Sequence, residues 1–143
     1  MGEMIIAIDF DGTCVTHEFP KIGKDINSVH VLKALVEKGH QLVLFTMRSD
    51  IVNPISNNKE IHLESGNYLT DAVNWFKENE ITLYGIQTNP TQHTWTTSPK
   101  AYAQMYIDDA ALGCPLIFNK DYSERPYVDW DLVNLMLISK SII

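Results

Sequence analysis

The 143-residue sequence predicts an α/β fold, because apolar runs alternate along it with amphipathic segments. Helix-like segments or polar loops separate five short apolar runs, at 4–8, 41–45, 83–86, 105–107 and 116–118. Strands that alternate with helices form parallel sheets, and strands buried on both faces are apolar throughout. We therefore expect a single Rossmann-like, doubly wound domain spanning 1–143, with a parallel central sheet of about five strands.

Three segments have the periodicity of amphipathic helices, with residues at their ends that favour helix starts and stops. The first helix is expected to begin at Asn27 or Ser28 and the second at Asn67 or Thr70. The third is expected to cover 132–139. Gly39 stands where a glycine commonly ends the first helix. Pro99 predicts a further short helix, because proline is favoured in the first helical turn.

Charge and composition exclude several classes of function. The chain has 18 acidic and 11 basic residues, a net charge of −7, which disfavours nucleic acid as a partner. No apolar run approaches the ~18 residues of a membrane span, and the N-terminus lacks the basic region of a signal peptide. The two cysteines, Cys14 and Cys114, have no metal-ligand spacing. We interpret them as reduced thiols of a cytoplasmic protein.

The motif that carries chemistry is Asp9-Phe10-Asp11-Gly12-Thr13, directly after the first apolar run. In extended chain the carboxylates of Asp9 and Asp11 can face the same side, and Gly12 allows a sharp turn away from the strand. A calcium-binding EF-hand is excluded, because the glycine is at the wrong position and no bidentate glutamate follows.

Other polar residues follow the later strands, where ligands bind in open parallel sheets. Thr46 ends the second strand, Asp108 and Asp109 follow the fourth, and Lys100 precedes it. The sequence thus predicts four carboxylates at one edge of the sheet. Carboxylates this close raise one another's pKa unless a cation joins them, and a hard dication such as Mg²⁺ prefers oxygen ligands.

The order of these motifs resembles the haloacid dehalogenase-like (HAD) hydrolase superfamily, over 4 to about 113. The resemblance implies a phosphohydrolase that cleaves a phosphate monoester through an aspartyl phosphate, with Asp9 as nucleophile and Asp11 as general acid and base. It also implies that Thr46 and Lys100 bind the transferring phosphoryl group. Mg²⁺ and the lysine would offset the repulsion between a carboxylate nucleophile and a phosphate dianion.

The same resemblance implies that Asp9, Asp108, Asp109 and the backbone carbonyl of Asp11 hold Mg²⁺. Asp108 is the expected direct ligand, with Asp109 weaker or acting through water.

Many members of the superfamily carry a cap domain, but 12–26 is too short for one and only seven residues separate Lys100 from Asp108. We therefore expect a capless member. The resemblance implies that such a member acts on a large substrate, or that its site is shielded by loops or by a second subunit of a homo-oligomer. The substrate stays unidentified. Arg48 suits a second phosphate or carboxylate on it. Weaker candidates for substrate contact lie on the long loops: His62, His93, Trp95, Lys120 and Arg125.

Three alternatives remain beside the hydrolase. A phosphotransferase or mutase would use the same residues. A non-catalytic phosphate- or metal-binding interaction protein would be expected to lack one of them, whereas all are present. A response-regulator receiver domain is disfavoured, because the third strand ends in Gln87-Thr88-Asn89 without the aspartate that such domains phosphorylate.

Overall fold

The computed structural model describes residues 2–52 and 63–143 and has a mixed α/β fold. Its helices are α1 (Val29–Glu37), α2 (Tyr68–Glu78), α3 (Trp130–Ser139) and a 3₁₀ turn, η1 (Gln92–Thr94). Its strands are β1 (Ile5–Ile8), β2 (Gln41–Leu44), β3 (Asp50–Ile51), β4 (Gly66–Asn67), β5 (Gly85–Ile86), β6 (Met105–Ile107), β7 (Leu116–Ile117) and β8 (Tyr127–Val128).

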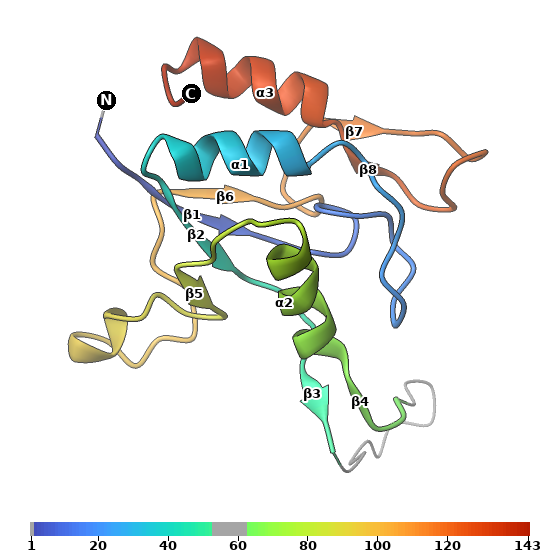
Figure 1. Cartoon of the computed structure of the whole chain (residues 1–143), viewed down its shortest axis with the longest axis horizontal. Coiled ribbons are helices and arrows are strands. Elements are labelled where there is room, and N and C mark those ends of the chain that lie inside the picture. The colour runs from blue at the N-terminus through green and yellow to red at the C-terminus, as the bar shows by residue number, and fades with distance from the viewer. Residues whose placement is uncertain (1, 53–62) are drawn as a thin grey trace.

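The central sheet has four parallel strands in the order β5-β2-β1-β6 (Figure 1). The chain moves outward from β1 to β2 and β5, then returns to the other side of β1 as β6. The strand order therefore reverses between β1 and β6, and ligands of open α/β sheets bind where such a reversal occurs. Ala7 pairs with Tyr106 and Ile8 with Ile107, so the residues after these strands, Asp9 and Asp108, emerge side by side.

The helices pack on one face of this sheet. Ile6 and Ile8 point into a core that also contains buried residues of α1, α2 and α3, and α1 and α3 lie together on that side in Figure 1. Side chains alternate along a strand, so Ala7 and Tyr106 lie on the second face. There the Tyr106 hydroxyl donates to the carbonyl of Ala101, in the connection from β5 to β6.

The helix ends agree in part with the sequence. Gly39 follows α1 with a φ of +93°, as expected of a glycine that ends a helix. Asn67 precedes α2 without a side-chain cap, and Asp50 of β3 instead accepts hydrogen bonds from the backbone and hydroxyl of Thr70. Asp129 caps α3 by accepting from the backbone N–H of Leu132 at 3.1 Å, so this helix begins two residues before the predicted range.

Two predicted elements are wrong. The fifth apolar run forms β7, but β7 pairs antiparallel with β8 in a separate sheet, so the parallel sheet has four strands. The connection from β6, 108–115, is shorter than the roughly twelve residues that a parallel crossover needs.

The helix expected near Pro99 is replaced by an irregular segment after η1. There the buried Gln92 side chain accepts from the N–H groups of Asn89 and Tyr102 and donates to the carbonyls of Ser98 and Lys100. These bonds satisfy the backbone without a helix.

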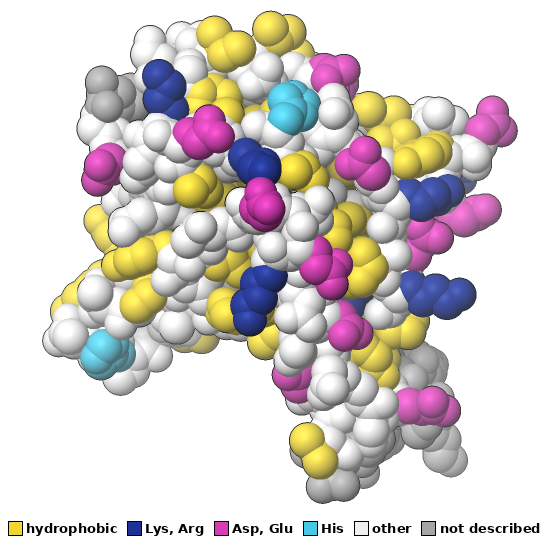
Figure 2. Space-filling view, viewed as in Figure 1, with side chains coloured by type: hydrophobic (Ala, Val, Ile, Leu, Met, Phe, Trp, Pro, Cys, Tyr) yellow, Lys and Arg dark blue, Asp and Glu magenta, His cyan; other side chains and the backbone are white. Residues whose placement is uncertain are grey.

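Cys14 is buried, Cys114 is half-buried, and both are free. Within 2–52 and 63–143, the structure has no helix that is long and apolar enough to cross a membrane. Acidic and basic side chains are interspersed on the face drawn in Figure 2, with hydrophobic side chains between them.

Candidate functional site

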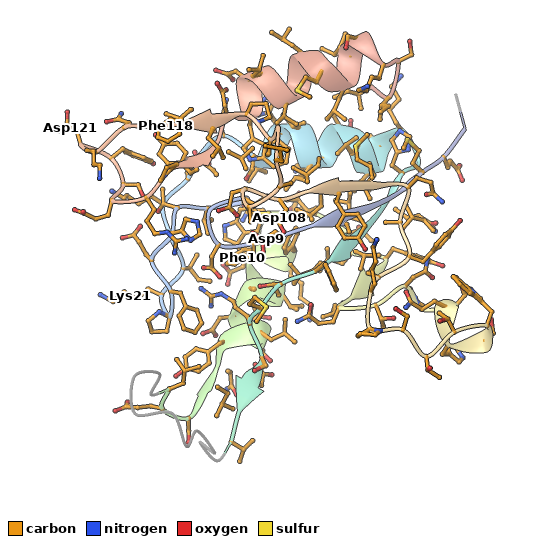
Figure 3. The ribbon with its side chains drawn as sticks, turned by 180° about the vertical axis from the view of Figure 1, so that it is seen from behind. Asp9, Phe10, Lys21, Asp108, Phe118 and Asp121 are labelled. Carbon is orange, nitrogen blue, oxygen red and sulfur yellow. The ribbon has the colours of Figure 1, made fainter. Side chains whose placement is uncertain are left out.

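The carboxyl ends of β1 and β6 bring three of the four predicted carboxylates together. Asp9, Asp108 and Asp109 each offer an oxygen, and these oxygens lie within 4.8 Å of one another. Asp9 is held at the strand end by a 3.1 Å hydrogen bond from its N–H to the carbonyl of Ile107. Figure 3 shows Asp9 and Asp108 next to each other at this end of the sheet.

The turn after Asp9 depends on Gly12. Its φ is +82°, and a Cβ at this position would lie 1.9 Å from Nε2 of His17. The turn is also tied to the C-terminal part of the chain. The N–H of Val128 donates to the carbonyl of Gly12 at 3.0 Å, and the indole N–H of Trp130 donates to that of Thr13 at 2.6 Å.

The Thr13 hydroxyl bridges Asp9, after β1, and Asp109, after β6. Its buried Oγ1 lies 2.9 Å from Oδ2 of Asp9 and 3.0 Å from Oδ1 of Asp109, and it accepts from the N–H of Asp109 at 3.0 Å. His17 Nε2 lies 2.8 Å from the other oxygen of Asp109. A hydroxyl has one proton, so a proton on Asp9 or on Asp109 would allow both carboxyl contacts to be full hydrogen bonds.

The pKa values of Asp9 and Asp109 are driven apart. Burial raises the pKa of Asp9 to about 8, and the hydrogen-bonded carboxyl of Asp109 and the charge of Asp108 act in the same direction. Burial also opposes ionisation of Asp109, but hydrogen bonds with His17, Asp9 and Thr13 outweigh it and lower its pKa to about 2. At neutral pH the proton therefore resides on Asp9.

The cluster fits a hard divalent cation. All its donors are carboxylate oxygens, and a cation would replace the proton that now relieves their repulsion. Both oxygens of Asp109 are occupied by Thr13 and His17, whereas Asp108 uses one oxygen to accept from the N–H of Ala110 at 2.8 Å. Among the described residues, Asp108 therefore has one carboxylate oxygen without a hydrogen bond, whereas Asp109 has none. The resemblance implies that Asp108 is the direct ligand and Asp109 the weaker one, and this assignment stays a prediction.

Asp11 lies outside the cluster, because its carboxylate is held by Arg48. Nε and Nη2 of Arg48 each donate to one oxygen of Asp11 at 2.8 Å. The remaining N–H groups of Arg48 donate to the backbone carbonyls of Pro20, Lys21 and Tyr68.

Arg48 is 2% exposed, and its guanidinium lies about 5 Å from the ring centroids of Phe10 and Phe19. With all five donors used inside the protein, it orients Asp11 rather than presenting free donors to a substrate. This geometry corrects the prediction that Arg48 binds substrate.

Thr46 lies at the cavity, and its hydroxyl donates to no residue in the described parts of the chain. Its Oγ1 accepts from the N–H of Arg48 at 3.1 Å, which leaves the hydroxyl proton for another acceptor. Gln87, after β5, fixes this loop by accepting from the N–H of Thr46 and donating to the carbonyls of Thr46 and Arg48. The sequence analysis did not predict a role for Gln87 at the site. Its position at the end of a predicted strand was the only feature of the sequence that indicated such a role.

Lys100 lies on the same sheet face as Asp9, but it is not brought into contact with the carboxylates. It is exposed, and its Nζ lies 5.8 Å from the centroid of the Tyr106 ring. Tyr106 pairs with Ala7, two residues before Asp9. The ammonium group of Lys100 therefore lies beside the middle of β1 and β6, before the strand ends where the carboxylates cluster.

A cavity of about 520 Å³ opens at these strand ends. Its polar wall contains the site residues Asp9, Asp11, Thr46, Arg48, Asp108 and Asp109, together with His17 and Arg125, and Phe19, Met47, Leu63 and Ala110 form its apolar wall. His93, Trp95, Lys100 and Lys120 do not line it. His93 and Trp95 belong to the segment 89–102 around η1, called the arm below, which Figures 1 and 3 show extending away from the site. The candidate His62 lies outside the described residues.

Comparison with known proteins gives one informative likeness. No family model matches the sequence, and no curated protein matches it. A solved structure of a conserved protein from Bacteroides thetaiotaomicron is similar, with 28% sequence identity and a TM-score of 0.70. The match covers 97% of this chain and 93% of that chain. The α/β fold described above therefore recurs along nearly the whole of that protein.

Proposed function

We propose that this protein is a Mg²⁺-dependent phosphohydrolase of the HAD-like type, which cleaves a phosphate monoester through an aspartyl phosphate. The observation that carries the proposal is the position of Asp9. It directly follows β1, the strand at which the sheet order reverses, shares a cluster with Asp108 and Asp109, and lines one cavity together with Asp11. The reversal agrees with a Rossmann-like strand order, although the parallel sheet has four strands and its helices pack on one face rather than on both, as a doubly wound domain requires.

Each residue has a role in the two steps. Asp9 reacts as the free carboxylate, after a cation has replaced its proton, and Asp11 enters this step with a proton on one oxygen, which requires that oxygen to leave Arg48. The carboxylate of Asp9 attacks phosphorus, the bond to the ester oxygen breaks, and Asp11 gives its proton to the leaving oxygen. Asp11 then takes a proton from water, which attacks the phosphorus of the aspartyl phosphate and releases inorganic phosphate and free Asp9. Arg48 supports Asp11 by fixing its orientation at the cavity wall. The Thr46 hydroxyl donates to an oxygen of the transferring group.

The cluster would hold Mg²⁺ through Asp9 and Asp108, with Asp109 in support and the backbone carbonyl of Asp11 as a further ligand. The cation would neutralise negative charge on the transferring phosphoryl group.

Lys100 is the remaining predicted cation. Its long flexible side chain, on the same face as Asp9, would have to leave the Tyr106 ring to reach that group.

The experiment compares hydrolysis of an aryl phosphate by the wild-type protein and by Asp9→Asn, with Asp121→Asn as an exposed control. We expect Asp9→Asn to lower phosphate release by about a thousandfold or more, while Asp121→Asn changes it little. Chelator should abolish wild-type activity and Mg²⁺ should restore it. Undiminished turnover by Asp9→Asn would refute the assignment of the nucleophile.

The same assay separates hydrolysis from transfer. A phosphotransferase would release less inorganic phosphate than alcohol when an acceptor alcohol is added, whereas a hydrolase releases the two in equal amounts.

A further inference from the structure

The two arginines of the chain line the same cavity but differ in burial and in hydrogen bonding. Arg48 is buried and uses all five N–H groups inside the protein. Arg125 is exposed, and its guanidinium has no hydrogen bond or ion pair with any residue in 2–52 or 63–143. A planar fork with unused donors at the rim of a cavity is suited to a carboxylate or phosphate group.

Arg125 is held near the site by its hairpin. It lies in the loop from β7 to β8, and β8 is bonded to the turn of the Asp9 motif through Val128 and Gly12. The tip of the loop is tied to the segment 17–26, where the Tyr122 hydroxyl donates to the carbonyl of Asp25.

Lys24 adds to this tie, because its Nζ donates to the carbonyl of Tyr122 and lies 4.5 Å from the centroid of that ring. Figure 3 shows Lys21 and Asp121, one on each of these loops, at the same edge of the molecule, with Asp9 and Asp108 nearer its centre. The loops thus form an ordered wall, and Arg125 belongs to it.

The charges around the cavity make Arg125 the candidate to bind a second anionic group of a substrate. Four aspartates line the cavity, His17 is paired with Asp109, and Arg48 with Asp11. Any anionic group on a substrate, apart from the phosphoryl group beside the cation site, would meet this negative field. Of the two arginines in the cavity wall, only Arg125 has donors that are not used by residues 2–52 or 63–143. In the same cavity, Phe19, Met47 and Leu63 provide an apolar wall for the body of a small molecule.

We propose that Arg125 binds a second anionic group, on the leaving-group side of a small phosphate-monoester substrate. This inference rests on the proposed function and names its substrate class: compounds with a phosphate ester at one end and a carboxylate or second phosphate at the other. Arg125 is then a residue that determines specificity.

The test measures binding of three inert phosphonates to the Mg²⁺-loaded protein by calorimetry, so that it does not depend on turnover. Propylphosphonate has one anionic group, 3-phosphonopropionate adds a carboxylate, and propane-1,3-diphosphonate adds a second phosphonate. We expect the wild-type protein to bind at least one of the two-anion ligands about tenfold to a hundredfold more tightly than propylphosphonate. The stronger of the two identifies the distal group as carboxylate or phosphate.

The variants are Arg125→Gln and the matched control Lys120→Gln, which removes the same charge from the same loop but from a residue outside the cavity. Arg125→Gln should reduce the preference for the second anion to about twofold or less, and Lys120→Gln should retain it.

The inference is overturned if the wild-type protein shows no preference or binds none of the three ligands. It is also overturned if the two variants behave alike, or if Arg125→Gln weakens all three ligands equally, which would place Arg125 on the phosphoryl group. Failure of the proposed function would appear separately, as full aryl phosphatase activity in Asp9→Asn.

Discussion

The edge of the sheet around Asp9 and the arm around η1 are built in opposite ways. At the edge, hydrogen bonds join residues that are far apart in the chain, such as Thr13 with Asp109 and Trp130 with Thr13. In the arm, Asn89 and Gln92 bond to backbone groups within 89–102. Long-range bonds bring Asp9 and Asp109 together, whereas the local bonds of the arm leave Lys100 exposed beside Tyr106. Residues that adjoin a strand end are therefore positioned by the sheet, and residues in a long connection are positioned by that connection.

The largest effect expected from the arm concerns Lys100. If its ammonium group moves to the phosphoryl group during the reaction, Lys100→Gln should lower kcat/KM for an aryl phosphate by about a hundredfold. Mg²⁺ affinity and thermal stability should change little, because the exposed ammonium group of Lys100 has no hydrogen bond or ion pair with residues 2–52 or 63–143 and lies beside the Tyr106 ring. Lys120→Gln is the control. A loss below about threefold would make Lys100 a surface residue and would leave the arm without a part in the chemistry.

A smaller effect is expected at the edge, from Thr13→Val. The substitution keeps the shape of the buried side chain but removes hydrogen bonds to Asp9 and Asp109, so it should lower the free energy of unfolding by about 2 kcal/mol. It should also weaken Mg²⁺ binding by about tenfold, because the two carboxylates lose their common partner. Urea unfolding and calorimetry measure the two quantities. Thr97→Val, an exposed control in the arm, should change neither, and Mg²⁺ affinity unaffected by Thr13→Val would contradict the role given to Thr13.

The smallest effect is expected from Gln92→Ala. Loss of its four backbone hydrogen bonds should increase amide hydrogen exchange within 89–102 and lower global stability by only about 1 kcal/mol, because water can reach the freed groups. Mg²⁺ binding should not change. Gln41→Ala, at the exposed start of β2, serves as the control. If Gln92→Ala weakened Mg²⁺ binding, the arm and the edge would be one cooperative unit, and the contrast between them would fail.

Sequence patterns were sufficient where a residue adjoins a regular element. The four parallel strands, Gly39 and the meeting of Asp9 with Asp108 follow from apolar runs and from the common edge of parallel strands. The pairing of β7 with β8 depends on the length of the preceding connection, which apolar runs do not show.

The partner of a side chain was harder to predict. The fork of Arg48 fits a substrate anion and the carboxylate of Asp11 equally well, and only the fold decides between them. The same holds for Gln87, whose amide completes a loop 39 to 41 residues earlier in the chain.

The central claim, that Asp9 is the nucleophile, is tested most directly by trapping the covalent intermediate. The wild-type protein would be mixed with an aryl phosphate and Mg²⁺, quenched, reduced with borohydride, and mapped by peptide mass. An aspartyl phosphate is an acyl phosphate, so reduction converts that side chain into an alcohol. We predict a substrate-dependent reduction at residue 9 and at no other aspartate. Reduction at a different carboxylate, or none while phosphate is released at the full rate, would contradict the account.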